Sequence, residues 1–371
     1  MTCQLYLQNP LDPESEFLLE TLIQQASGAG GGAGAFAWAT ALGVKLLLRD
    51  KVFESFAKRG SFDLVVGMDA VTNTRAIAAL DVAQQEIGSL NVRIFVTERN
   101  EPMFHPKCSW FTNQDGGVIV AGSGNLTEAG LRGNWEAYVL SRISAQEMES
   151  VRDQWATWLE TNANSLREVT DPVVLERAAA NDRVVGTLRP GRRYARGTAT
   201  TRDLATSDKV LVAELSRSGE RWSQVNFDLD NYEKYFGARR GTQRRVLFRH
   251  VAKDGSLQDV ESRPSVEVAS QNYRFELDAA RGLRYPDRGT GRPIAVFLKV
   301  LPRSFVYRLL MPGDEGYQEA EGYLKRTWVG RGDRMRRVRT SLKDLGDLRV
   351  AKVLERAANR MLNSDEVTAG I

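Results

Sequence analysis

The first part of the chain alternates short apolar runs with segments of helical periodicity. Residues 62–69 and 91–98 are apolar runs typical of buried strands, whereas residues 17–27 and 75–90 carry apolar side chains at helical spacing. Further strands are predicted in the stretches KCSWF, GGVIVAGSG and EAYVLSRI, followed by a helix over residues 145–161. This alternation favours an α/β domain over residues 1–165, with a mixed, mostly parallel sheet flanked by helices.

A run rich in glycine and alanine, GAGGGAGAFAWATALG, interrupts this pattern at residues 28–43. Its spacing is not GxGxxG and it follows a helix instead of a strand, so a dinucleotide-binding loop is a poor fit. We expect a loop leading into a strand or helix that packs closely against its neighbours.

The pattern changes after residue 165. Residues 166–206 have little apolar periodicity and predict a linker rich in Arg, Gly and Thr. Residues 207–325 contain many short strands, which predict a mainly β barrel or sandwich, and residues 326–371 predict a basic helical tail. The linker arginines either follow a phosphate backbone or simply keep the linker solvated: Arg189, Arg192, Arg193 and Arg196.

Composition fits a two-domain globular protein. The chain has 371 residues, of which 42% are hydrophobic and 26% charged. It has no long apolar run and no basic head before an apolar block, so we expect a cytoplasmic protein. Cys3 and Cys108 are too few for a disulfide framework or a four-thiolate zinc site. The net charge of +4 is compatible with a polyanionic partner but does not identify one.

Candidate catalytic side chains cluster around one of the two histidines. His105 and Lys107 are two positions apart, so on a strand both would point to one face. Ser123 and Asn125 have the same spacing at the end of the next apolar strand, and Glu136 opens a third. Neighbouring strands are therefore expected to project these groups into one pocket.

This set suits attack on a phosphodiester. A neutral imidazole is nucleophilic near pH 7 and forms a phosphohistidine, which splits one displacement into two. Lys107 and Asn125 would hold the non-bridging oxygens, and Glu136 would orient the imidazole. No paired acids or second histidine accompany His105, so we expect no metal cofactor.

The stretch FHPKCSWF…IVAGSGNLTEAGLRGNWEAYV resembles the phospholipase D superfamily, in which H-x-K is followed by G-S-x-N. The sequences GSGNLT and N-x-E are similar to those of the nuclease branch, notably BfiI-like restriction endonucleases and the CglI/NgoAVII group. The resemblance implies His105 as nucleophile or acid, Lys107 and Asn125 as phosphate ligands, and Glu136 as support for the histidine. Ser123 matches the serine of the motif. One position departs from the broader motif, because Thr112 stands where that motif has an aspartate.

Chemistry of this superfamily uses two histidines, of which one attacks and the other protonates the leaving oxygen. The chain has only His105 and His250, and His250 lies in the predicted β domain. A two-fold axis can bring two copies of His105 together. We therefore expect a homodimer through the catalytic domain, with one composite active site at its interface.

The predicted β domain carries arginines between its strands, in SRSGERWSQ, GARRGTQRR and ARGLRYPDRGTGR. Arginines in loops suit phosphate contacts and base readout in the major groove. Solvated loops of an ordinary β domain are the alternative. The candidate DNA-binding residues are Arg217, Arg221, Arg239, Arg240, Arg281, Arg284, Arg288 and Arg292.

The stretches VNFDLDNYEKYFGARRGTQRRVLFRHV and NYRFELDAARGLRYP are similar to the DNA-binding domain of BfiI-like enzymes, a pseudobarrel related to plant B-three transcription factors. That resemblance implies two loop arms that grip the major groove. The first arm would hold Arg217 and Arg221, and the second Arg281, Arg284 and Arg288.

Together these patterns favour a sequence-specific, metal-independent endonuclease that cuts double-stranded DNA, a phosphodiester hydrolase of the type II-like restriction class. In the CglI/NgoAVII group the nuclease chain works with an NTP-dependent helicase-like subunit. This chain has no GxxxxGK[ST], so NTP and Mg²⁺ would enter only through such a partner. The arginines of the tail would dock that partner or pack on the DNA domain: Arg331, Arg334, Arg336, Arg337 and Arg339. The alternatives are a phospholipase D-like phosphodiesterase acting on a non-DNA substrate and, third, a DNA-binding protein without catalysis.

Overall fold

The structure is a computed structural model, and it describes residues 2–69, 71–97, 102–187, 209–217, 222–265, 273–287, 289–331 and 334–363. The chain divides into two compact units. The described residues up to 187 belong to the first unit, and residues 209–363 contain the second.

The described strands of the first unit form one eight-stranded sheet in the order β1-β7-β6-β5-β2-β3-β4-β8. The sheet is mixed, as predicted, but it is mostly antiparallel and not mostly parallel. The reason is local, since β5, β6 and β7 follow one another along the chain through short connections, and parallel neighbours need a long crossover. The strands are β1 (Thr2–Gln8), β2 (Gly31–Phe36), β3 (Phe62–Gly67), β4 (Leu90–Phe95), β5 (Lys107–Asn113), β6 (Gly116–Gly122), β7 (Glu136–Ser144) and β8 (Leu166–Glu168).

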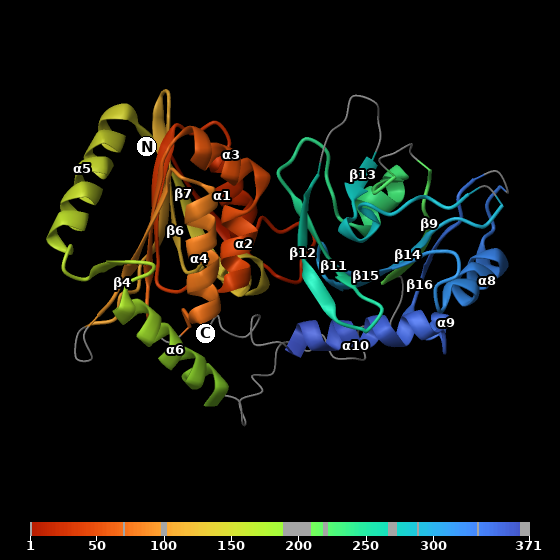
Figure 1. Ribbon diagram of the computed structural model, residues 1–371. Coiled ribbons are helices and arrows are strands. Elements are labelled where there is room, and N and C mark those ends of the chain that lie inside the picture. Colours follow the sequence, from red (N-terminus) through yellow and green to blue (C-terminus); the bar gives the residue numbers. More distant parts are fainter. Residues whose placement is uncertain are drawn as a thin grey trace. The chain divides into compact units, whose positions relative to one another are not determined.

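Helices cover the two faces of this sheet unequally. Helices α1, α2, α3 and α4 lie on one face and α5 lies on the other (Figure 1). The helix predicted over residues 145–161 is present with those bounds, whereas strand β1 was not anticipated. The helices are α1 (Leu18–Ala26), α2 (Ala41–Leu48), α3 (Lys51–Arg59), α4 (Thr74–Glu86), α5 (Ala145–Thr161) and α6 (Pro172–Thr187).

Strand β2 is the central part of the glycine- and alanine-rich run. All of its residues are buried. A Cβ atom at Gly32 would lie 2.4 Å from the carbonyl oxygen of Trp110, and one at Gly34 would lie 2.8 Å from Ser109 Oγ. The missing side chains therefore let β2 and β5 approach closely, which is the packing that the sequence suggested.

The segment expected as a linker is partly ordered structure of the first unit. Strand β8 pairs with β4, and Val174 and Ala178 of α6 are buried. These few apolar side chains stabilise the segment through tertiary contacts, which local periodicity does not reveal. The rest of the expected linker, with Arg189, Arg192, Arg193 and Arg196, lies outside the described residues.

The second unit is mainly β in its described part. A six-stranded sheet has the order β12-β11-β15-β14-β9-β16, and β10 pairs with β13 in a separate ribbon. Among the described strands no barrel closes, because β12 and β16 remain edges of the larger sheet. The strands are β9 (Val210–Glu214), β10 (Gln224–Phe227), β11 (Arg245–Val251), β12 (Leu257–Pro264), β13 (Tyr273–Glu276), β14 (Ile294–Leu301), β15 (Ser304–Leu310) and β16 (Arg337–Thr340).

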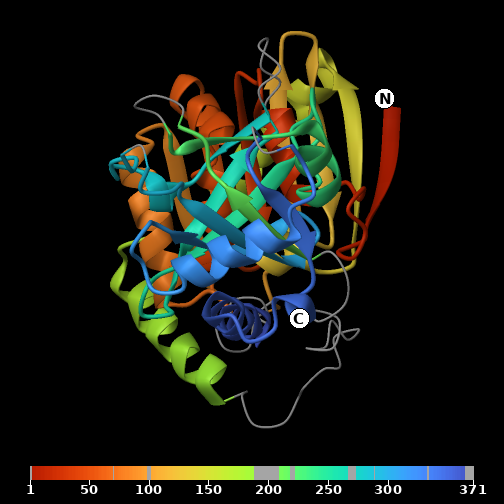
Figure 2. The same cartoon turned by 90° about the vertical axis from the view of Figure 1, so that its right-hand side faces the viewer.

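Part of the expected basic tail belongs to the core of this unit. Strand β16 pairs with β9, and helix α10 (Arg349–Asn363) buries Leu354 and Ala358 against the larger sheet (Figure 2, where α10 is seen nearly end-on). Helices α8 (Tyr317–Thr327) and α9 (Leu342–Leu345) pack into the same apolar cluster. The tail docks because its apolar positions recur on one helix face.

No helix in the described ranges is long and apolar enough to cross a lipid bilayer.

Candidate functional site

Three neighbouring strands bring the candidate catalytic residues to one edge of the first sheet. Strand β5 starts at Lys107, β6 ends just before Ser123, and β7 starts at Glu136. Because β6 runs antiparallel to both neighbours, these three ends meet at the same edge.

His105 and Lys107 touch each other. The sequence predicted that His105 lies on a strand. In the structure it lies in the segment before β5, because β5 begins only at Lys107. Even so, Lys107 Nζ lies 3.0 Å from Nδ1 and 3.1 Å from Nε2 of the imidazole, and it donates to the His105 carbonyl oxygen at 3.1 Å. The imidazole is exposed. A nucleophile and a cation are thus available to the same small anionic group.

Burial lowers the pKa of Lys107, and the nearby carboxylate of Glu136 partly opposes this shift. This coupling places Glu136 close enough to affect the ammonium.

Glu136 has a different partner from the one expected. Its carboxylate accepts hydrogen bonds from Ser123 Oγ and, at 3.3 Å, from Asn134 Nδ2. Ser123 Oγ in turn accepts from the backbone N–H of Ala137 at 3.0 Å. Glu136 therefore fixes the serine at the end of β6 and is not bonded to the imidazole of His105 within the described chain. Glu136 lies beside Ser123 because it is the first residue of β7, whereas His105 is positioned by the segment that precedes β5.

Asn125 is buried behind this edge. Its Oδ1 accepts from the backbone N–H of Trp38 at 3.2 Å, and the next residue, Leu126, exchanges backbone bonds of 3.1 Å with Trp38 and Thr40. Thr40 caps α2 by accepting from the Gly43 N–H. With its oxygen engaged in this bond, Asn125 has its amide nitrogen as the group that can donate a hydrogen bond to a ligand.

Trp38 is a site residue that the sequence analysis missed. Its ring meets the imidazole of His105 edge-on at a centroid distance of 5.4 Å, and Lys107 Nζ lies 5.9 Å from the ring centroid. Trp38 lies in the run rich in glycine and alanine, for which the sequence predicted only close packing. The available signal was a tryptophan, the larger of the two aromatic residues in a run made mostly of glycine and alanine.

The second histidine has a different environment from His105. His250 lies on β11 in the other compact unit and is half-buried. Its burial, and secondarily the charge of Arg308, lower its pKa to about 4. The imidazole is therefore neutral and a poor proton donor near pH 7.

No group of three or more His, Cys, Asp or Glu side chains in the described ranges is arranged to hold a metal ion.

The second unit contains a pocket of about 1080 Å³. Three connections meet there: the segment after β9, the connection between β13 and β14, and the connection between α8 and β16. Asp228, Asn231 at the start of the short helix η3 (Asn231–Tyr235), and Arg337 of β16 complete the lining. The connections contribute Ser216 and Arg217; Tyr285, Pro286, Asp287, Gly289, Gly291 and Arg292; and Trp328, Arg334 and Met335.

The pocket gathers some of the predicted DNA-binding arginines but not all. Arg217 and Arg292 line it, whereas Arg221 and Arg288 lie outside the described residues. Several of the predicted arginines, Arg292 among them, are engaged by carboxylates. Arg240 pairs with Glu233 at 3.6 Å, Arg284 with Asp287 at 3.0 Å, and Arg292 with Glu214 at 3.4 Å. Arg239 is held through its backbone N–H, which donates to Ser265 Oγ at 3.2 Å.

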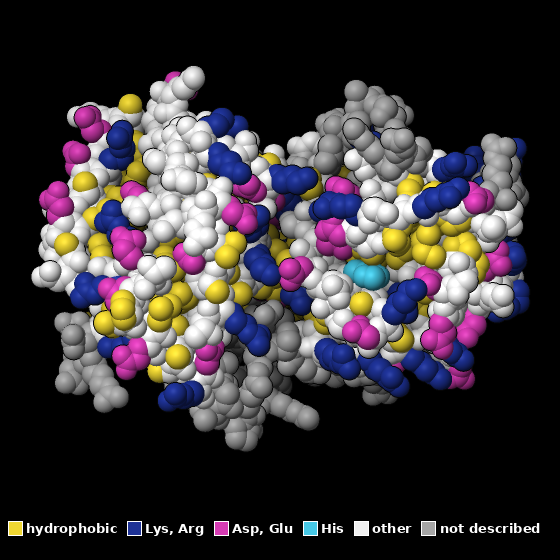
Figure 3. Space-filling view, in the orientation of Figure 1, with side chains coloured by type: hydrophobic (Ala, Val, Ile, Leu, Met, Phe, Trp, Pro, Cys, Tyr) yellow, Lys and Arg dark blue, Asp and Glu magenta, His cyan; other side chains and the backbone are white. Residues whose placement is uncertain are grey.

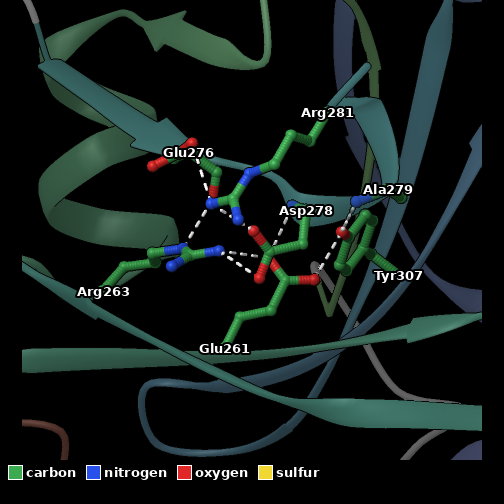
Figure 4. A network of polar contacts seen from close by, with 7 residues as sticks. All are labelled: Glu261, Arg263, Glu276, Asp278, Ala279, Arg281 and Tyr307. Carbon is green, nitrogen blue, oxygen red and sulfur yellow. Dashed lines mark hydrogen bonds and ion pairs between the residues drawn. The ribbon is translucent and has the colours of Figure 1, made fainter. Parts of the chain in front are cut away.

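Arg281 belongs to a polar network rather than to a free arm (Figure 4). Its Nη2 lies 3.0 Å from Glu276 Oε1 and 2.8 Å from Asp278 Oδ1. The centre of the network is Glu261, which accepts from Tyr307 at 2.6 Å and from Arg263 at 2.9 Å. Burial raises the pKa of Glu261 in spite of these donors. The network ties β12, β13 and β15 together, so the position of Arg281 is structural in this state.

Charges of both signs are mixed on the face drawn in Figure 3, where Lys and Arg lie beside Asp and Glu over both units. The location of unpaired cations is thus more informative than the total number of basic residues.

No protein-family model matches the chain, and no curated protein matches it. Among solved structures, the chain is similar to a phospholipase D family member, Nuc from Salmonella typhimurium, with 18% identity and a TM-score of 0.34 over 45% of this chain and 97% of that chain. NucT from Helicobacter pylori is similar at 15% identity and a TM-score of 0.33, over 45% and 98% of the two chains. Yeast tyrosyl-DNA phosphodiesterase is similar at 16% identity and a TM-score of 0.28, over 38% and 32%. Likeness at this level assigns no activity to the chain.

Proposed function

We propose that the chain is a phosphodiester hydrolase in which His105 is the nucleophile. The observation that carries this proposal is the contact of the exposed imidazole with the Lys107 ammonium at 3.0–3.1 Å. A phosphate that binds this cation would place its phosphorus beside the ring nitrogens.

The reaction would have two displacements. An imidazole nitrogen attacks phosphorus, an N–P bond forms, and the P–O bond to the leaving oxygen breaks as that oxygen takes a proton. Water then attacks phosphorus and breaks the N–P bond, which regenerates the imidazole. Lys107 and Asn125 stabilise charge on the non-bridging oxygens, and Glu136 holds Ser123 in place through their hydrogen bond. These steps use no metal ion.

The proton for the leaving oxygen would come from a second copy of the chain. His250 is a poor donor for the reasons given above, so a homodimer with two copies of His105 at one interface supplies both roles.

An exposed apolar surface beside the site fits this dimer. Leu5 and Leu7, on the edge strand β1, are 63% and 72% exposed, and they lie opposite Val139 and Ala137 of β7. Trp135, directly before the catalytic end of β7, is 67% exposed. An exposed apolar strand edge next to a half-complete site is typical of a surface that a second copy covers.

The substrate we propose is double-stranded DNA. The pocket of the second unit brings together Arg217, from the first predicted arm, and Arg292, another of the predicted DNA-binding residues. Sequence-specific cleavage in a restriction system, alone or with a helicase-like NTP-hydrolysing partner, is the role that this combination of a nuclease site and a basic recognition unit suits best.

The first test is cleavage of plasmid DNA in the presence of EDTA. Wild-type protein is expected to cut, and His105→Ala should lower the rate at least about a thousandfold because the attacking atom is gone. His250→Gln, which alters the other histidine, is the matched control and should keep the activity. Cleavage that survives in His105→Ala would overturn the proposal. Lipid turnover without DNA cleavage would favour the alternative substrate.

A further inference from the structure

The connection between α8 and β16 forms one wall of the pocket in the second unit. It contributes Trp328, Arg334 and Met335, and β16 itself contributes Arg337. The sequence placed these residues in a basic tail beyond the DNA-recognition domain. The fold instead puts them in the same pocket as Arg217 and Arg292.

Most arginines of this segment are committed to internal ion pairs. Arg336 and Arg337 contact Glu214 at 2.9 Å and Asp228 at 3.1 Å, and Arg339 contacts Asp230 at 2.7 Å. These pairs fasten the segment to the rest of the unit.

Glu214 is the main anchor of this wall. It is only 7% exposed, and its Oε2 accepts from the Arg336 backbone N–H at 2.9 Å. The same carboxylate contacts the guanidinium of Arg292, which lies just before β14. One buried carboxylate therefore connects β9, the segment before β14 and the α8–β16 connection, which makes the pocket wall a fixed surface.

Arg334 differs from its neighbours. It is exposed, lines the pocket, and forms no ion pair with another residue in the described ranges. Arg217 shares these properties on the wall that follows β9. Arg217 and Arg334, which have no carboxylate partner among the described residues, thus come from two different walls of one pocket, an arrangement that suits an anionic ligand lying between them.

Trp328 adds an aromatic surface to the same wall. It is half-buried, and its ring lies over Gly330, where an added Cβ would approach Cζ2 to 2.1 Å. The glycine therefore sets the position of the ring. An arginine and an aromatic ring that line the same pocket match the phosphate and the base or sugar of a nucleic acid.

We propose that the α8–β16 connection is a third DNA-contacting segment, in which Arg334 binds a backbone phosphate and Trp328 contacts the adjoining nucleotide. This inference rests on the proposed function and extends it, because it assigns the duplex a contact outside the two predicted arms.

The test measures binding of the full-length protein to a fluorescent DNA duplex of mixed sequence at several salt concentrations. Arg334→Ala should weaken binding about tenfold at low salt and reduce the slope of log K against log salt by about one. Arg326→Ala is the matched control, since Arg326 is an exposed arginine on α8 that does not line the pocket. It should leave the slope unchanged.

A second variant separates stacking from charge. Gly330→Ala displaces the Trp328 ring and should weaken binding several-fold without changing the salt slope, because no cation is lost. Thermal unfolding of each variant checks that the fold is retained.

The outcomes distinguish the two proposals. If the wild-type protein binds no duplex, the proposed DNA substrate is wrong. If the wild type binds and Arg334→Ala behaves like Arg326→Ala, the third contact segment is wrong and the DNA substrate stands.

Discussion

At the scale of single residues, the catalytic edge is organised around Lys107. Its ammonium contacts the imidazole of His105. The negative charge of Glu136 raises the pKa of Lys107. Partial burial disfavours the charged amine, and the carboxylate restores part of the loss. Glu136 thus influences the site through Lys107 and through Ser123, in addition to any role toward the histidine.

This coupling predicts a shift in the pH dependence of cleavage. Glu136→Gln removes the charge that raises the pKa of Lys107, so that pKa falls further below its usual value. The cation is then lost at lower pH, and the alkaline limb of the pH–rate profile should move toward lower pH. Rates of DNA cleavage across the pH range check this. A limb that stays in place or moves upward would contradict the role of Lys107 as the phosphate-binding cation.

At the scale of elements, the strand β11 contains a histidine that is constrained by the fold. Burial lowers the pKa of His250 from 6.5 to about 4, and its ring lies 5.2 Å from that of Tyr307 on β15. In the unfolded chain the same imidazole keeps its ordinary pKa. The two states therefore bind different numbers of protons in the window between these values.

Stability should accordingly fall as the solution becomes more acidic. Between pH 6.5 and about 4 the unfolded chain binds more protons at His250, so the free energy of unfolding decreases as the pH drops. Each pKa unit corresponds to about 1.4 kcal/mol, and solvent screening of a half-buried ring reduces the total effect to about 2 kcal/mol.

Denaturant unfolding of wild type and His250→Gln at several pH values measures this contribution. The difference in unfolding free energy between the two proteins should change through this window and level off below it. If the difference in unfolding free energy does not change with pH, His250 has the same pKa in the folded and the unfolded chain, and the prediction is wrong.

At the scale of the whole molecule, the proposed active site needs two copies of the chain. One copy offers one exposed imidazole, and the edge strand β1 beside it exposes two leucines. Burial of apolar surface is the general driving force for association. Catalysis and dimerisation should therefore be lost together.

Leu5→Asp combined with Leu7→Asp is expected to weaken the dimer and to reduce cleavage by at least about tenfold, because charges replace the apolar contact. Val82→Asp is the control, since Val82 is a 48% exposed residue on α4. Sedimentation and cleavage rates at matched concentrations measure both properties. A stable monomer with full activity would disprove the composite site.

The sequence identified the candidate catalytic residues and most of the local elements of the first unit. The spacing of His105, Lys107, Ser123 and Glu136 predicted groups at the ends of adjacent strands, and the structure brings these ends to one edge. Periodicity also located helix α5 and most of the buried strands. These features are predictable because they depend on residues near one another in the chain.

Only the tertiary structure decided which partners these residues have. It placed Trp38 against His105, directed Glu136 to Ser123, and made the sheet mostly antiparallel. In the second unit it paired Arg281 with two carboxylates and brought Arg334 into the pocket. An arginine in a loop has the same sequence signature whether it faces a carboxylate or a ligand. The difference depends on contacts between segments far apart in the chain, and those exist only once the sheets have formed.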